Sequence, residues 1–256
     1  MIRAIEDAIA AIESQQEVRI LFAAESGSRA WGFASPDSDY DVRFIYVHQR
    51  DWYLTIGEPR DVIEAMLPGD LDLSGWELRK TLRLFLRGNA ALNEWLGSPI
   101  VYADRDGLAD ELRTLLPSAF RTTAAYHHYL SMARGVIAEH LQGEQVRLKK
   151  VFYALRPLLA CRWIAAANSQ PPTAFAELCS APWVEAGERA MIDALLMAKT
   201  AAREVDAQPV KSELRRWLAI ELAAATAKAN DIRSVASLEI DTLDAVFRRL
   251  LYSPGE

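Results

Sequence analysis

The sequence is poor in the residues that build thiol- and imidazole-based sites. Its 256 residues include two cysteines, Cys161 and Cys179, and four histidines. Two cysteines are too few for a disulfide framework, and they lack the paired spacing of a zinc site. Both lie among apolar residues, which favours buried free thiols. The composition therefore argues against a disulfide-stapled fold and against a zinc finger.

Long apolar runs are missing too. A membrane-spanning helix needs about 20 consecutive apolar residues, and the sequence has no uncharged run of that kind. Residues 1–16 carry acidic side chains inside an apolar helical pattern, which is typical of an amphipathic helix and not of a signal peptide. We therefore expect a cytoplasmic protein without a membrane partner.

The chain also lacks an excess of positive charge. Its 29 lysines and arginines stand against 35 aspartates and glutamates, which gives a formal net charge of −6. Proteins that bind nucleic acid through a wide face are usually basic, so we expect at most a small basic cleft. With 51% hydrophobic residues the chain can build a sizeable core, and its length suits two modest domains.

What the chain does contain is a Gly-Ser step shortly before two alternating aspartates. Gly27 and Ser28 are expected to end one strand and open a helix, where free backbone amides can bind phosphate. Asp39 and Asp41 lead into an apolar strand, 42–47, and would point the same way, about 6.6 Å apart. Two such carboxylates repel each other, so a divalent cation is expected between them. A phosphate-binding turn beside a metal-binding pair is suited to phosphoryl or nucleotidyl transfer.

The spacing of this segment resembles that of a known superfamily. Ten residues separate Ser28 from Asp39, within the string Gly-Ser-Arg-Ala-Trp-Gly-Phe-Ala-Ser-Pro-Asp-Ser-Asp-Tyr-Asp-Val-Arg-Phe. The string resembles the DNA polymerase β-like nucleotidyltransferases, and within them the stand-alone branch of which some members are associated with RNA repair. The resemblance implies two Mg²⁺ ions, with Mn²⁺ as a substitute, and transfer of a nucleoside monophosphate from an NTP such as ATP to an acceptor hydroxyl.

The superfamily has a third acid on a later strand, and two residues here qualify. Asp70 and Asp72 both alternate with leucines, so either could share the required face. Asp72 stands two residues before the Ser-Gly-Trp step, which is the position that the resembling branch uses. We therefore expect Asp72 to be the third carboxylate and keep Asp70 as the alternative.

The resemblance also implies roles for these residues. The catalytic and metal-binding set would be Asp39, Asp41 and Asp72. Asp72 would in addition take the proton from the acceptor hydroxyl. The phosphate-binding set around the turn would be Gly27, Ser28 and Arg29. Arg29 could equally form an ion pair with Asp37.

A second group of site residues is expected on a helix in the later part of the chain. Lys149, Tyr153 and Arg156 stand at i, i+4 and i+7 and would share one helix face. The string around them resembles a helical-domain string of the same branch. Two cations and an aromatic ring suit the triphosphate and base of an NTP, so these residues are expected to bind nucleotide. The alternative is an ordinary solvated basic stripe.

The patterns along the chain predict an α+β fold in two parts. Residues 1–103 would form a small mixed-sheet head domain, and residues 104–256 an α-helical bundle domain. Strands are expected at 18–24, 42–47, 61–67, 70–73 and 99–102. Helices of the head are expected at 1–16, 76–87 and 90–96, and those of the bundle at 124–141, 145–167, 185–203, 211–229 and 240–251.

The acceptor hydroxyl is the least determined part of the prediction. The RNA-repair association of the resembling branch favours an RNA 3′ end. A protein hydroxyl, as in AMP-transferring antitoxins with the same head, is the second possibility, and a small-molecule hydroxyl the third. A non-catalytic nucleotide-binding module is the alternative outside the enzymes, and the presence of all three expected carboxylates disfavours it. The sequence does not determine which NTP is used or the oligomeric state.

Overall fold

The computed structural model describes residues 1–201, 206–234 and 236–253 of the chain. Its contacts group into two compact units. The head unit comprises Met1–Ala30, Asp39–Ala119 and Ala236–Glu256, and the helical unit comprises Trp31–Ser38 and Phe120–Val235. This grouping differs from a single boundary at residue 103, because two segments far along the chain pack on the sheet and one early loop packs among the helices.

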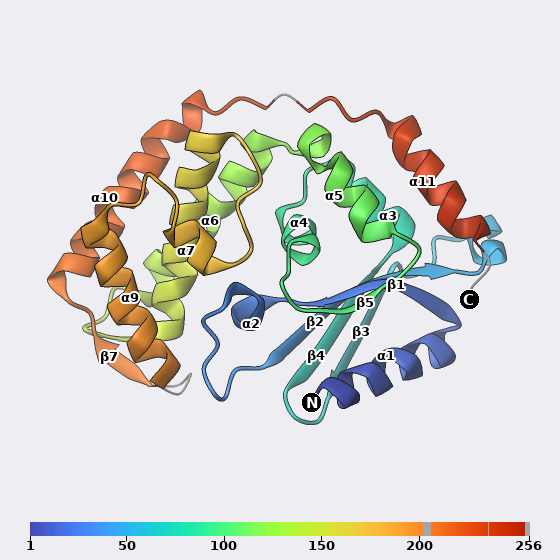
Figure 1. Ribbon diagram of the computed structural model, residues 1–256, viewed down its shortest axis with the longest axis horizontal. Coiled ribbons are helices and arrows are strands. Elements are labelled where there is room, and N and C mark those ends of the chain that lie inside the picture. Colours follow the sequence, from blue (N-terminus) through green and yellow to red (C-terminus); the bar gives the residue numbers. More distant parts are fainter. Residues whose placement is uncertain (202–205, 235, 254–256) are drawn as a thin grey trace. The chain divides into compact units, whose positions relative to one another are not determined.

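A five-stranded mixed sheet forms the centre of the head unit (Figure 1). Its strands are β1 (Val18–Glu25), β2 (Tyr40–His48), β3 (Val62–Leu67), β4 (Leu71–Glu77) and β5 (Val101–Asp104). Their order is β3-β4-β2-β1-β5. Only the β2–β4 pair among these is parallel. The helices of the unit are α1 (Ile2–Gln16), α2 (Gly27–Trp31), α3 (Leu78–Leu86), α4 (Ala90–Leu96), α5 (Leu108–Ala119) and α11 (Ile240–Tyr252), with a 3₁₀ helix at Arg50–Leu54.

Helix α1 covers one face of this sheet. Ile5, Ile9 and Ile12 recur at helical spacing and are buried against apolar residues of β1, β2 and β4. The helix ends where Glu17 adopts the left-handed conformation with a φ of 50°, and its amide donates to the Glu13 carbonyl. The apolar periodicity of the sequence therefore corresponds to a real packing face.

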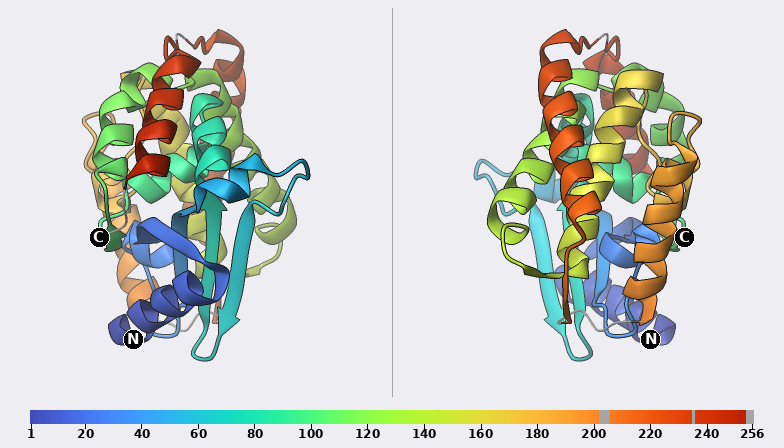
Figure 2. Two further views of the ribbon diagram at one scale, coloured as in Figure 1. Left: turned by 90° about the vertical axis from the view of Figure 1, so that its right-hand side faces the viewer. Right: turned by 90° about the vertical axis from the view of Figure 1, so that its left-hand side faces the viewer.

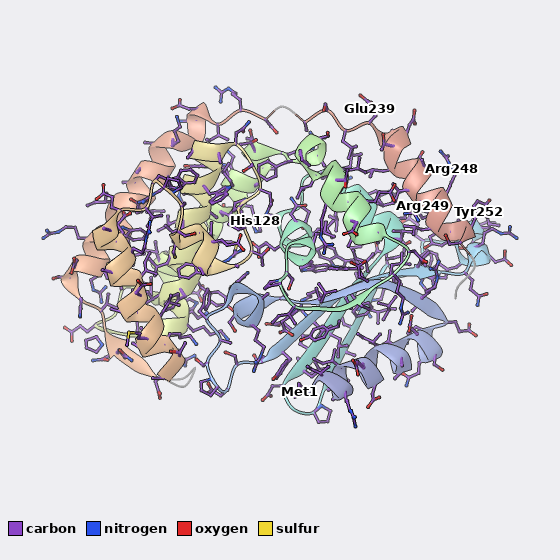
Figure 3. The ribbon with its side chains drawn as sticks, in the orientation of Figure 1. Met1, His128, Glu239, Arg248, Arg249 and Tyr252 are labelled. Atoms are coloured by element: carbon purple, nitrogen blue, oxygen red, sulfur yellow. The ribbon has the colours of Figure 1, made fainter. Side chains whose placement is uncertain are left out.

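Four helices, α3, α4, α5 and α11, cover the opposite face of the sheet. Their apolar sides meet the alternate strand residues, such as Phe22 and Ile45, in a second core. Arg249, which is labelled on α11 in Figure 3, donates to the Asp106 carbonyl at 2.9 Å and pairs with Glu111. The last described helix of the chain is thereby part of the head unit.

The register of the parallel β2–β4 pair decides which side chains lie opposite each other on these two strands. Asp41 lies opposite Asp72, and Phe44 lies opposite Gly75. A Cβ atom at Gly75 would lie 2.1 Å from the Phe44 ring, so no larger residue fits there without moving that ring. The Ser-Gly-Trp step of the sequence thus has a packing reason.

The helical unit is built around a long central helix, α7 (Figure 2). Its elements are α6 (Thr122–His140), β6 (Gln145–Arg147), α7 (Leu148–Ala167), α8 (Phe175–Cys179), α9 (Ala186–Ala201), β7 (Ala207–Pro209), α10 (Ser212–Lys228) and a 3₁₀ helix at Ala229–Asp231. Helices α6, α8, α9 and α10 all contact α7. Cys161 and Cys179 are buried free thiols, as predicted, and burial raises the pKa of each to about 12.

The predicted fold class is confirmed, with local corrections. Helix α5 was not predicted, although the spacing of Leu108 and Leu112 indicates it. Residues 145–147 pair with 207–209 as short strands, so α7 begins three residues later than expected. The predicted helix 185–203 is observed as α9 up to Ala201, and Arg203 lies outside the described residues. In the described part of the chain, every helix is too short or too polar to cross a lipid bilayer.

Candidate functional site

Two carboxylates face each other at one end of the parallel strand pair. Asp41 near the start of β2 and Asp72 near the start of β4 are partners in the register. Their side chains are 29% and 32% exposed, so solutes can reach them. Asp70 lies instead in the preceding turn with a φ of 54°, outside the strand. The structure therefore brings Asp72, and not Asp70, beside Asp41.

Arg43 bridges this carboxylate pair. Its Nη2 atom donates to Asp41 Oδ1 at 3.0 Å and to Asp72 Oδ2 at 2.8 Å. Its Nη1 atom donates to the main-chain oxygens of Val42 and Asp72 at 3.2 and 3.3 Å. Arg43 stands two residues after Asp41 on the same strand face, which is why it reaches both acids. Sequence reasoning expected a positive charge between carboxylates but missed that the chain itself supplies one.

The Gly27 turn packs directly against Asp41. Gly27 has a φ of 61°, and a Cβ atom there would lie 2.3 Å from Asp41 Oδ2. The neighbouring Ser26 amide donates to the Asp41 carbonyl at 2.7 Å. The helix α2 that follows has five residues, so its effect on an anion would come from individual amides and not from a long helix dipole. As predicted, the Gly-Ser step ends β1 and opens a helix.

Glu25 supports the same turn from inside the unit and was not identified from the sequence. It is fully buried, and its carboxylate accepts hydrogen bonds from the Asp41 amide at 2.9 Å and from the Tyr102 hydroxyl. Burial raises the pKa of Glu25, and the two hydrogen bonds oppose that effect. Because Glu25 and Ser26 bind the two sides of one peptide segment, the Asp41 backbone is held firmly. The signal for Glu25 was an acid within an otherwise apolar strand, directly before the turn.

Asp39 is placed differently from Asp41. It is exposed and lies directly before the first residue of β2. Arg29 Nε donates to the Asp39 carbonyl at 3.0 Å, and its guanidinium lies 3.6 Å from the Tyr40 ring centroid. Among the described residues no three His, Cys, Asp or Glu side chains are grouped closely enough to hold a metal ion. The strand register thus brings Asp41 and Asp72 together, and Asp39 stays a predicted ligand.

The pair nevertheless offers ligands that suit a hard divalent cation. Mg²⁺ and Mn²⁺ prefer carboxylate and carbonyl oxygens, and Asp41 and Asp72 present such oxygens from adjacent strands. The glycine at position 27 leaves the space beside Asp41 Oδ2 that any other residue would fill. The residues present therefore fit a cation held by Asp41 and Asp72.

The predicted nucleotide-binding residues of α7 lie in the helical unit. Lys149 and Tyr153 are half-buried, and the Lys149 ammonium lies 5.9 Å from the Tyr153 ring centroid. Arg156 is only 1% exposed, and its guanidinium carbon lies 4.5 Å from the Trp31 ring centroid. Tyr153 contacts the same indole edge-on at 5.2 Å. Arg156 is thus a buried cation of the helical unit that packs on Trp31, and its role in nucleotide binding stays a prediction.

The mixed sheet, the Gly-Ser turn packed against Asp41 and the opposed Asp72 agree with the polymerase β-like nucleotidyltransferases that the sequence motif resembles. The sequence model of the RNA repair pathway DNA polymerase beta family, RlaP, matches residues 1–249. The chain belongs to this family.

Two individual proteins are also similar to this chain. The Bacillus subtilis (strain 168) protein YcgL is 44% identical to this chain over 230 residues, which are 90% of this chain and 88% of YcgL. The crystal structure of a nucleotidyltransferase-like protein from Exiguobacterium sibiricum 255-15 aligns over 89% of this chain and 75% of that chain, with 12% identity and a TM-score of 0.31.

Proposed function

We propose that this nucleotidyltransferase is metal-dependent and transfers a nucleoside monophosphate from an NTP to the 3′ hydroxyl of an RNA. The bond between the α- and β-phosphates is broken, and pyrophosphate is the leaving group. The observation that carries the proposal is the placement of Asp41 opposite Asp72, directly beside the Gly27 turn. This arrangement puts cation ligands next to backbone amides that can bind phosphate. The RNA acceptor is supported by the description of the family as belonging to an RNA repair pathway.

Each residue of the site has a chemical task in this proposal. Asp41 and Asp72 would hold the cation, and Asp72 would accept the proton of the acceptor hydroxyl. The amides of Gly27 and Ser28 would bind the β- and γ-phosphates, with Arg29 balancing their charge. A bound divalent cation would neutralise the triphosphate and acidify the attacking hydroxyl.

Three expectations from the sequence enter the proposal with different support. Glu25 and Ser26 fix the Asp41 backbone, and this positioning favours Asp41 as a ligand. Asp39 stays a predicted ligand, at the entry of β2 and outside the observed pair. Contact of Lys149 and Tyr153 with the NTP also stays a prediction, based on the family resemblance.

The decisive experiment separates the possible acceptors. The protein is incubated with Mg²⁺, each of the four α-labelled NTPs in turn and a mixture of short RNAs, and labelled RNA is then resolved from labelled protein. Asp41→Asn serves as the control for contaminating polymerases. Label on the RNA 3′ end that depends on Asp41 and Mg²⁺ supports the proposal. Label on protein would move the acceptor to a protein hydroxyl, and label on neither would contradict both.

A further inference from the structure

The bridging guanidinium of Arg43 has no place in the chemistry above. It lies in direct contact with the two aspartates that the proposed function assigns to the metal. Arg43 is itself 19% exposed, so the contact is shielded from bulk water more than a surface ion pair would be. An arginine stays protonated at any physiological pH. Its positive charge is therefore permanent and can leave the carboxylates only by movement of the side chain.

The need for such a charge follows from the strand register. Asp41 and Asp72 are directly opposed on neighbouring strands, where like charges destabilise a sheet. One nitrogen, Nη2, contacts one oxygen of each acid at 3.0 and 2.8 Å. A cation shared by the two carboxylates would meet this positive charge whichever of their oxygens it takes. Arg43 and a divalent cation thus compete for the same pair of negative charges.

We propose that Arg43 acts as a built-in competitor of the metal. It holds the carboxylate pair together in the metal-free enzyme and must give up at least one aspartate when the site is loaded. This inference rests on the metal-dependent function proposed above. Its consequence is weak metal binding in the absence of nucleotide, with the affinity set by a residue that is not itself a ligand.

The surface beside Arg43 gives the side chain room to move. A groove of about 370 Å³ is lined by Arg43, Glu64, Asp72, Ser74 and Trp76, among others. Glu64, which pairs with the exposed Arg60, is a second carboxylate in this groove. A displaced guanidinium would therefore stay in contact with an acidic surface.

The test measures metal affinity without nucleotide and without turnover. Metal-free wild type, Arg43→Gln, Arg43→Lys and Arg248→Gln are titrated with Mn²⁺, and free Mn²⁺ is followed by electron paramagnetic resonance. Arg248→Gln is the matched control, because it removes the same charge from the head unit at an exposed residue of α11 that does not line the groove. Circular dichroism melts of the metal-free proteins are recorded in parallel.

Competition predicts a specific pattern. Arg43→Gln should bind Mn²⁺ about tenfold more tightly than wild type, because a charge-assisted bridge no longer opposes binding. Its metal-free melting temperature should fall, and Mn²⁺ should raise that temperature more than it does for wild type. Arg43→Lys should lie between the two, since an ammonium keeps the charge without the planar fork. Arg248→Gln should match wild type in both measurements.

Other outcomes overturn the inference. Equal or weaker Mn²⁺ binding by Arg43→Gln would mean that Arg43 supports the metal site or is indifferent to it. An equal gain in Arg248→Gln would reduce the effect to general charge. If Arg43→Gln does not fold, Arg43→Lys decides by the same criterion. Absence of Mn²⁺ binding in every variant would contradict the metal dependence itself, whereas binding that is equal in all of them contradicts the Arg43 inference alone.

Discussion

Both units of this protein contain an arginine that bridges two carboxylates, yet the two groups differ in how they are bonded. In the helical unit Arg162 pairs with Glu188 and Glu221, and these side chains are 16–20% exposed. Glu188 also accepts from the Trp217 indole at 2.8 Å and from the Glu185 amide at 3.0 Å. Its carboxylate is thus surrounded by fixed donors, as expected of a structural ion pair.

In the head unit Arg43 contacts the carboxylates of Asp41 and Asp72 through a single nitrogen, and the two acids are about twice as exposed as Glu188. A bridge of this kind can be exchanged for another cation, whereas the Arg162 network cannot be opened without leaving buried charge. In the proposed function, similar residue composition therefore serves stability in one unit and metal binding in the other. The exposure of the carboxylates makes the difference.

The largest expected effect lies in the head unit. Asp41→Asn and Asp72→Asn should each reduce turnover by about 10³-fold or more, as loss of a catalytic group typically does, while the protein stays folded. Asp70→Asn is the control and should stay within a few-fold of wild type, because Asp70 lies in the turn. Single-turnover assays and thermal melts measure both properties. If Asp70→Asn had the stronger effect, the third carboxylate would be Asp70 and not Asp72.

The next largest effect, a loss of stability, tests whether the loop Trp31–Ser38 belongs to the helical unit and not to the head unit. Phe33 lies in the loop Trp31–Ser38, between the Gly-Ser turn and β2, and is fully buried against Phe152 and Phe175 of the helical unit. Phe33→Ala should destabilise that unit by about 3–4 kcal/mol. Hydrogen exchange should show lost protection in α7 and α8 first.

Phe85→Ala is the matched control for this substitution. Phe85 is equally buried but lies in the core of the head unit. Its substitution should therefore reduce protection in β1 and β2 and spare α7. Loss of protection in the same elements for both variants would mean that the two cores unfold as one.

A third prediction concerns the structural ion pair and its dependence on pH. Burial raises the pKa of Glu188, but the bonds from Arg162, Trp217 and the Glu185 amide outweigh this and lower it from 4.5 to about 2. The folded protein thus binds this proton less tightly than the unfolded chain, so the carboxylate stabilises the fold above pH 4.5. That contribution, about 3 kcal/mol, is lost as the pH falls from 4.5 to 2.

Glu188→Gln should therefore cost about 3 kcal/mol of unfolding free energy at pH 7 and progressively less below pH 4.5. Denaturant unfolding at several pH values, followed by tryptophan fluorescence, measures it. A deficit that is independent of pH would mean that shape or packing, and not charge, accounts for the role of Glu188.

A smaller effect is expected at the Gly27 turn. Gly27→Ala should cost about 1–2 kcal/mol of stability from the positive φ and should also lower turnover, because the new Cβ meets Asp41 Oδ2. Gly32 has a φ of 88° but nothing within 4 Å of its Cβ position. Gly32→Ala should consequently lose stability without the added loss of turnover. Equal kinetics in the two variants would remove the steric argument for Gly27.

The smallest effect is expected on α7. Lys149→Ala should raise the KM for NTP about three- to tenfold with little change in kcat, since a phosphate contact formed in the ground state is lost. Arg147→Ala, on the exposed strand residue just before the helix, provides the control. An unchanged KM for Lys149→Ala would mean that Lys149 does not contact the NTP and belongs to an ordinary solvated basic stripe.

The sequence predicted local structure well and long-range contacts poorly. The Gly27 turn and the strand that carries Asp41 follow from short-range patterns of glycine, polar and apolar residues. Arg43 was overlooked because a strand pattern shows that it shares a face with Asp41 but not which side chain it meets on another strand. Arg156 looked like a surface cation because helical spacing cannot reveal that Trp31, over a hundred positions earlier, covers it.

For the same reason, the sequence could not show that α5 and α11 belong to the head unit. Both helices have apolar faces that would fit either unit. Their partners are strand residues far away along the chain. Amphipathicity predicts that a helix is buried on one side, but not against what.

The loop Trp31–Ser38 has a further consequence, for the order in which the protein can fold during synthesis. The chain passes between the units at four places, after residues 30, 38, 119 and 235. The helical unit needs Phe33, which is made early, and the head unit needs α11, which is made late. Neither unit is a continuous stretch that could complete its core as it leaves the ribosome. The part of the head core that α11 covers must therefore stay exposed until nearly the whole chain has been synthesised.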